Sequence, residues 1–200
     1  TCISRDSTII GSNNIIIGGS TIVFPKTIIR GDLKRISSRS SNTISIGNDC
    51  ILFEGCVIRP PWKKSYDVVP YPSLNSNVID NDPKVRLNYF PVQIGNNVII
   101  GEDSIVEASE IGPYTIIGAN CIIGKMVSIG DHVKIADGSY VPPFSVIPSG
   151  SILIGNPAHN VASFNDNTNT LNTRENEQKY KNIEEEINHV RRNVINLFKR

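Results

Sequence analysis

The sequence has little of what marks several common protein classes. Its 200 residues include three histidines, four cysteines and only 6% aromatic residues, and no two cysteines show the Cys-x-x-Cys spacing. No apolar run approaches the roughly 20 residues that a membrane-spanning helix requires. Lysine plus arginine number 20 and aspartate plus glutamate 19, so the basic excess of nucleic-acid-binding domains is missing. We therefore expect a soluble, cytoplasmic protein without membrane insertion, nucleic-acid binding, or a zinc or disulfide framework.

What the sequence does contain is a repeat of six residues. Small residues often stand two positions before the repeating aliphatic one, and glycine often follows it. Neither the 3.6-residue period of a helix nor the alternation of a strand produces such a pattern. The aliphatic positions fall in four blocks: Ile10, Ile16, Ile22 and Ile28; Ile46, Leu52 and Ile58; Ile94, Ile100 and Val106; and every sixth residue from Ile111 to Leu153.

A hexad fits one side of a triangular coil that contains three short strands per turn. The aliphatic residue then fills the interior, the small residue points inward beside it, and glycine serves the tight corner. The pattern resembles the hexapeptide-repeat, left-handed parallel β-helix, and the handedness comes from that resemblance alone. We expect an all-β solenoid with a C-terminal α-helix. Cys50, Cys56 and Cys121 occupy the small inward position, which favours compact apolar packing over a reactive thiol.

Breaks in the repeat set the expected boundaries. The β-helix covers residues 1–160, with inserted loops at 34–43 and 62–90, of which 72–84 has a disordered loop as its alternative. A polar linker follows at 161–172 and a helix at 173–200, which we expect to pack along the prism or onto a partner. Its apolar stripe consists of Tyr180, Ile183, Ile187, Val190, Val194 and Leu197.

Two enzyme classes share this fold, γ-class carbonic anhydrases and acyltransferases. The first needs three imidazoles, two of them five residues apart, whereas His132, His159 and His189 lie 27 and 30 residues apart. An acyltransferase needs a general base, which is typically a histidine. The outward position of His132 in a regular coil favours a surface residue over such a base. Gly155-Asn156-Pro157-Ala158 resembles an element that closes many acyltransferase β-helices near coenzyme A, but a proline turn ending the last coil is preferred. We therefore predict no catalytic residue and no cofactor, and keep both enzyme classes as alternatives.

Polar residues gather where two early coils end. Arg30 and Asp32 leave one coil, and Arg59 leaves the next toward Trp62, Lys63 and Lys64. Either Asp32 pairs with Arg59 across the coils or these groups bind a partner. Lysine beside an aromatic ring is typical of protein interfaces, so Trp62, Lys63 and Lys64 are predicted to form an exposed recognition edge.

At these residues the sequence resembles the dynactin subunit 5 family. The similarity rests on Ile28-Ile29-Arg30-Gly31-Asp32, on Val57-Ile58-Arg59-Pro60-Pro61-Trp62-Lys63-Lys64, on Phe90-Pro91 and on Val141-Pro142-Pro143-Phe144, and it covers about residues 3–158. It implies a non-catalytic subunit of the dynactin pointed-end complex in the cytoplasm and cytoskeleton. The implied partners are dynactin subunit 6, dynactin subunit 4, the pointed-end actin-related protein and dynein adaptors. The two insertions and the charged C-terminal helix depart from the family pattern.

Overall fold

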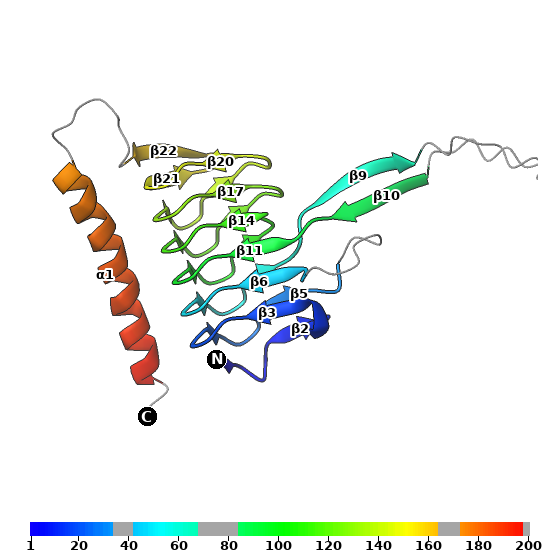
Figure 1. The fold of residues 1–200 in the computed structure, drawn as a ribbon, viewed down its shortest axis with the longest axis horizontal. Helices are drawn as coiled ribbons and strands as arrows, with labels where there is room; N and C mark the ends of the chain where they lie inside the picture. Colours follow the sequence, from blue (N-terminus) through cyan, green and yellow to red (C-terminus); the bar gives the residue numbers. More distant parts are fainter. Residues whose placement is uncertain (34–41, 68–83, 164–172, 198–200) are drawn as a thin grey trace, which may run out of the picture.

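The computed structural model describes residues 1–33, 42–67, 84–163 and 173–197. Three sheets of parallel strands wind into a triangular prism, with a long helix along one side and a hairpin projecting from the opposite corner (Figure 1). We call the faces sheets A, B and C, in the order in which each coil visits them. None of the helices among the described residues is long and apolar enough to cross a membrane.

Sheet A has eight strands, and its last strand runs antiparallel to its neighbour. Its strands are β1 (Cys2–Ile3), β4 (Ile22–Val23), β7 (Ile51–Leu52), β12 (Ile99–Ile100), β15 (Ile116–Ile117), β18 (Lys134–Ile135), β21 (Ser151–Gly155) and β22 (Ala158–Ser163). Sheet B contains β2 (Thr8–Ile10), β5 (Ile28–Arg30), β8 (Val57–Ile58), β13 (Ile105–Val106), β16 (Ile122–Ile123) and β19 (Tyr140–Val141).

Sheet C contains β3 (Ile15–Ile17), β6 (Ile44–Ile46), β11 (Val92–Ile94), β14 (Glu110–Ile111), β17 (Ser128–Ile129) and β20 (Val146–Ile147). A single 3₁₀ turn, η1 (Ser12–Asn14), precedes β3. The hairpin consists of β9 (Trp62–Asp67) and β10 (Lys84–Tyr89), and the helix is α1 (Thr173–Leu197).

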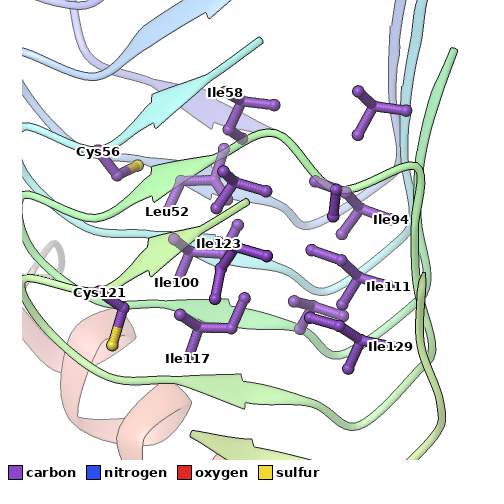
Figure 2. Packing of buried hydrophobic residues seen from close by; sticks show 14 of the residues in the cluster. Leu52, Cys56, Ile58, Ile94, Ile100, Ile111, Ile117, Cys121, Ile123 and Ile129 are labelled. Atoms are coloured by element: carbon purple, nitrogen blue, oxygen red, sulfur yellow. The ribbon is translucent and has the colours of Figure 1, made fainter. Parts of the chain in front are cut away.

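The prism interior is a stack of aliphatic side chains, one from each sheet in every coil. Ile100, Ile117 and Ile123 are fully buried, and Figure 2 shows such residues stacked in columns. Each column gains burial from the coils above and below, so the core is stabilised by stacking rather than by any one coil. Cys56 and Cys121 lie beside these columns at 0% exposure, as the sequence predicts.

The first block of the repeat is one residue out of the predicted phase. Ile29 pairs with the inward Ile58, whereas Ile28 pairs with the outward Val57. The inward residues of this block are therefore Ile9, Ile17, Val23 and Ile29, and the predicted Ile10, Ile16, Ile22 and Ile28 face outward. Aliphatic residues occupy both positions here, so hydrophobicity alone does not select the inward one.

The glycines after the aliphatic residues serve a different purpose from the one predicted. At Gly101 a Cβ atom would lie 2.4 Å from the carbonyl carbon of Gly118 in the next coil, and at Gly47 it would lie 2.5 Å from the Gly95 oxygen. These glycines allow the coils to approach closely. The corners themselves are turned by residues with positive φ, most of which are not glycine, including Asp49, Tyr114 and His132.

Two of the predicted boundaries also change, those of the inserted loop at 62–90 and of the linker. Residues 62–90 were expected as a loop, but Trp62–Asp67 and Lys84–Tyr89 pair antiparallel as the hairpin β9–β10. The linker was expected to begin at residue 161, but β22 continues to Ser163 because it pairs with β21 through the turn at Asn156-Pro157. Residues 34–41, 68–83 and 164–172, and with them most of the predicted insertion and linker, lie outside the described residues, as do 198–200.

Candidate partner-binding surface

The corner between sheets B and C brings together most of the predicted binding residues, but their pairing differs from the prediction. Asp32 binds Arg30 within the same coil, in a two-pronged ion pair with both distances at 2.8 Å. The hydrogen bond from Arg30 lowers the pKa of the Asp32 carboxyl and raises that of the guanidinium. Of the two alternatives, the Asp32–Arg59 pair is therefore wrong, because Asp32 is held by the nearer Arg30.

Arg59 instead pairs with Glu107, which lies on the next coil at the same corner. The distance from its Nε to the Glu107 carboxylate is 2.7 Å, and the glutamate side chain is only 16% exposed. Residues 60–91 separate the two coils in sequence, which is why spacing alone does not reveal this contact. Each arginine thus neutralises a neighbouring carboxylate. Both arginine side chains stay partly exposed at the corner.

The base of the hairpin is fastened to this corner by cations that lie over aromatic rings. Lys125 lies 4.0 Å from the centroid of the Trp62 ring. Lys63 lies 5.5 Å from the Phe90 ring and 5.4 Å from the Phe144 ring. Such contacts contribute about 0.5–1 kcal/mol each at exposed sites. Trp62 is half-buried, so it is part of the fastening rather than a fully exposed recognition residue.

Lys63 and Lys64 of the predicted edge are both exposed, and Lys64 lies on β9 next to the fastened base. It stands opposite Leu87 on β10, and Leu87 is 44% exposed. The pair forms an apolar and basic patch at the root of the hairpin, which points away from the prism in Figure 1. An exposed aliphatic side chain beside a lysine suits a protein contact.

Sheet A shows how an outer face of this prism is covered. Its outward residues Ile22, Ile51, Ile99 and Ile116 are each no more than 9% exposed because α1 lies over them. Ile183, Ile187 and Val194 supply the apolar side of the helix, with Tyr180, Val190 and Ile195 packed at its margins. The predicted stripe is thus buried against the prism, except that Leu197 at its end is 67% exposed.

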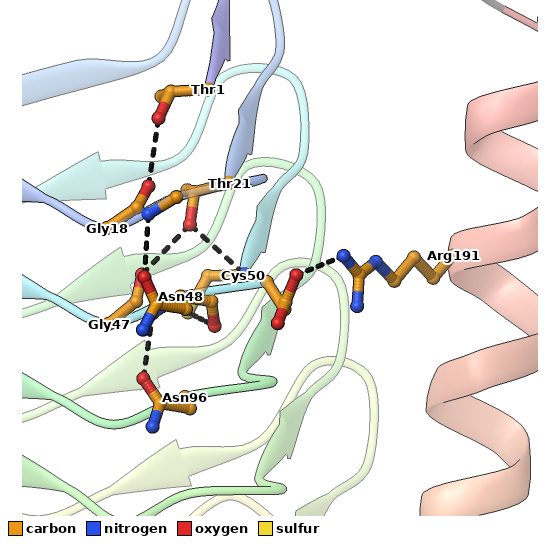
Figure 3. A network of polar contacts seen from close by, with 10 residues as sticks. Thr1, Gly18, Thr21, Gly47, Asn48, Cys50, Asn96 and Arg191 are labelled. Atoms are coloured by element: carbon orange, nitrogen blue, oxygen red, sulfur yellow. Dashed lines mark hydrogen bonds and ion pairs between the residues drawn. The ribbon is translucent and has the colours of Figure 1, made fainter.

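Polar contacts fix α1 over sheet A and along its corner with sheet C. Arg191 pairs with Asp49, and Lys134 donates to both carboxylate oxygens of Glu186 at 2.7 Å. Figure 3 shows Arg191 reaching from the helix to the corner, where Asn48 and Asn96 link successive coils. Because Asp49 sits at a positive-φ corner position, its side chain points out of the prism toward the helix.

His132 belongs to this helix contact and is not a free surface residue. Its ring stacks on Tyr114 with centroids 4.9 Å apart and meets the edge of Tyr180 at 4.8 Å. Its Nε2 lies 3.0 Å from a Glu184 carboxylate oxygen. The predicted surface position is therefore corrected, because α1 covers this corner and leaves the His132 side chain only 20% exposed.

The other candidate reactive groups are dispersed. His159 lies in β22 with Nδ1 3.4 Å from the Pro157 oxygen, and His189 lies on α1 beside Asn193. In the described part of the chain, no three histidine, cysteine or acidic side chains come together in a way that could hold a metal ion. Burial raises the pKa of the Cys50 and Cys56 thiols to about 11 and also raises that of Cys121, which disfavours thiolate formation there.

Comparison with known proteins identifies the family. A family model described as Dynactin subunit 5 matches residues 81–184, slightly more than half of the chain. The chain belongs to the dynactin subunit 5 family. Dynactin subunit 5 of Dictyostelium discoideum is 35% identical over 107 residues, which cover 54% of this chain and 41% of that protein. The chain thus spans about two fifths of the length of this curated relative.

Solved structures confirm the fold class. A hexapeptide transferase family protein from Anaplasma phagocytophilum superimposes with a TM-score of 0.57 and 17% identity, covering 96% of this chain and 91% of that one. At this identity the likeness shows the fold alone. The chain is therefore a left-handed parallel β-helix with a C-terminal helix.

Sequence reasoning missed the outer face of sheet B. The outward residues of its successive strands, Ile28, Val57, Ile105, Ile122 and Tyr140, form a continuous apolar ladder. Ile122 is 47% exposed and the other four are half-buried. The signal is the apolar residue that directly precedes the inward residue in each of these strands, but the expected phase of the first block places Ile28 inside the prism.

Proposed function

We infer that the chain is a non-catalytic subunit of a dynactin complex and acts as a rigid scaffold at its pointed end. The family membership supports this reading. The single structural observation that carries it is the commitment of His132 to the helix contact, where Tyr114, Tyr180 and Glu184 surround its ring. A ring held in this way serves the fold and is not placed to remove a proton from a substrate.

The proposed partners are dynactin subunit 6, dynactin subunit 4, the pointed-end actin-related protein and dynein adaptors, in the cytoplasm and on the cytoskeleton. A prism whose coils are paired through continuous sheets presents surfaces that change little on binding. The hairpin root at Trp62, Lys63 and Lys64, with Arg30 and Arg59 below it, supplies a basic and aromatic margin for such contacts. This arrangement suits the assembly of several subunits around one rigid member.

Co-purification of dynactin subunits 4 and 6 with the tagged chain tests the assembly role. The double variant Lys63→Glu/Lys64→Glu reverses charge at the hairpin root. Arg59 is left unchanged, because its replacement would leave the largely buried Glu107 unpaired. We expect recovery of the partners to fall at least about tenfold, equivalent to the loss of about 1.4 kcal/mol.

The matched control is Lys181→Glu, which alters an exposed lysine on α1. Lys181→Glu should keep the wild-type melting temperature. The double variant should keep the wild-type circular dichroism spectrum and lose no more than about 1–2 kcal/mol of stability with the two Lys63 ring contacts. Undiminished recovery of both subunits by the folded double variant would overturn the role of the hairpin root. A wild-type chain that recovers neither subunit would overturn the assembly role itself.

A further inference from the structure

Sheets A and B carry matching apolar ladders on their outer faces, but only the first is covered by another described element. In sheet A the ladder Ile22, Ile51, Ile99 and Ile116 lies beneath α1. In sheet B the corresponding ladder runs from Ile28 through Ile122 to Tyr140, and none of its side chains belongs to either hydrophobic cluster of the described residues. Sheet C differs from both, because Ser45, Gln93, Glu110 and Ser128 follow one another on its outer face.

The covered ladder shows which shape fits such a face. Adjacent strands lie about 4.8 Å apart, while an α-helix rises about 5.4 Å per turn. One apolar side chain per helical turn therefore meets about one rung, as Ile183, Ile187 and Val194 do on sheet A. The five rungs of sheet B span about 19 Å, which corresponds to about 13 residues of helix.

The two margins of sheet B carry opposite charge. At the corner with sheet A, the acidic residues Asp6, Glu54, Glu102, Asp103 and Asp137 outnumber Arg5 and Lys26, and Lys26 pairs with Glu54 at 2.6 Å. At the corner with sheet C, the cations Arg30, Arg59, Lys63, Lys64 and Lys125 outnumber Asp32 and Glu107. An occupant with one basic and one acidic flank meets both margins favourably.

We propose that the outer face of sheet B binds an amphipathic α-helix of a partner protein, lying along the stack of coils with its basic flank toward Glu102 and Asp103 and its acidic flank toward Arg59 and Lys125. The intramolecular α1 contact is the template: an apolar seam over the rungs, with an ion pair, Arg191–Asp49, at its margin. A partner helix here reproduces that arrangement between molecules. Sheet B thereby becomes a second helix-binding face of the same prism.

Fluorescence anisotropy with a designed helical peptide of about 18 residues, or five turns, tests this directly. The probe carries leucine on one stripe, lysine on one flank and glutamate on the other. Two companion peptides carry lysine on both flanks or glutamate on both. We expect the mixed peptide to bind the full chain at least about fivefold more tightly than either companion, because only it complements both margins.

Three variants locate the contact. Ile122→Asp places a charge in the middle of the ladder and should weaken the mixed peptide at least about tenfold, since a buried isoleucine contributes about 1.5–3 kcal/mol. Gln93→Asp adds the same charge to sheet C and should leave binding unchanged. Glu102→Lys should reduce the preference for the mixed peptide over the glutamate-flanked one. All three substitutions are at exposed side chains, and the melting temperature reports whether each variant is folded.

Several results would overturn the proposal. These are no binding of any peptide, binding that Ile122→Asp leaves intact, or equal affinity for the three peptides. Self-association of the chain that Ile122→Asp abolishes would assign the face to a second copy instead. None of these measurements uses dynactin subunits, so failure here leaves the assembly role to be judged by the co-purification experiment.

Discussion

Sheets A and B are built from the same repeat but have different surroundings. Ile99 on sheet A is 5% exposed beneath α1, whereas Ile122 on sheet B is 47% exposed. Both are outward residues that directly precede an inward isoleucine in the sequence. The difference teaches that the hexapeptide repeat builds the prism without determining which faces are covered, because coverage depends on what lies outside the repeat.

The largest difference in stability between the two faces is expected when a charge is placed on the same coil of each. Ile99→Asp should lower the free energy of unfolding by about 3 kcal/mol or more, because the carboxylate would be buried beneath α1 without a partner. Ile105→Asp, on sheet B of the same coil, should cost within about 1 kcal/mol. Chemical denaturation measures both, and equal losses would contradict the difference in coverage.

Truncation of the apolar seam tests α1 itself. Ile187 is 1% exposed, so Ile187→Ala should cost about 2–4 kcal/mol by leaving a cavity against sheet A. Leu197→Ala, at a residue 67% exposed, should change stability by less than about 0.5 kcal/mol. Circular dichroism at 222 nm follows the helix, because α1 is the α-helix of the described part of the chain. If Ile187→Ala left the denaturation midpoint of this signal unchanged, the apolar seam would not be what holds α1 against sheet A.

The ion pairs at the margin should matter less than the seam. Arg191 pairs with Asp49 across the helix contact, whereas its neighbour Arg192 donates a hydrogen bond within α1, to the Asn188 oxygen. Arg191→Ala should therefore cost about 1 kcal/mol and Arg192→Ala close to nothing. The double variant Arg191→Ala/Asp49→Ala should then lose no more stability than the two single variants lose together. Equal losses of stability in the two arginine variants would show that the Arg191–Asp49 pair does not stabilise the packing of α1 on the prism.

The smallest expected effect lies at the corner of sheet B, where Arg30 lowers the pKa of Asp32. A carboxyl with a lowered folded-state pKa adds stability above its unfolded-state pKa, and this stability is lost as pH falls through the folded value. Asp32→Asn should cost at most about 1 kcal/mol at neutral pH, because both side chains are about one-third exposed. The difference from the native chain should vanish in acid, and a difference that persists below the folded pKa would rule out this pair as its source.

The sequence predicts the coils well because the six-residue period recurs at inward aliphatic residues from Ile94 to Val106 and again from Ile111 to Val141. It fails in the first block because each strand carries two aliphatic residues. Thr21 and Thr27, both at 0% exposure, mark the inward residues two positions later and could have corrected the phase. The pairing of Arg59 with Glu107 was beyond reach, since the insertion hides which coil follows which.

The same limit applies to the candidate surface. The cations Arg30, Arg59, Lys63 and Lys64 were found from their neighbours in sequence, but their partners depend on stacking across coils. His132 appeared to be a surface residue because its corner position points outward. Only the long-range contact with Tyr180 and Glu184, about fifty residues later, shows that it holds α1.

The most direct test of the central claim is light scattering coupled to size-exclusion chromatography, on the full chain alone and mixed with dynactin subunit 6. A scaffold subunit should elute without a homotrimer and should form a one-to-one complex with subunit 6. A stable homotrimer that ignores subunit 6 would contradict the assembly role.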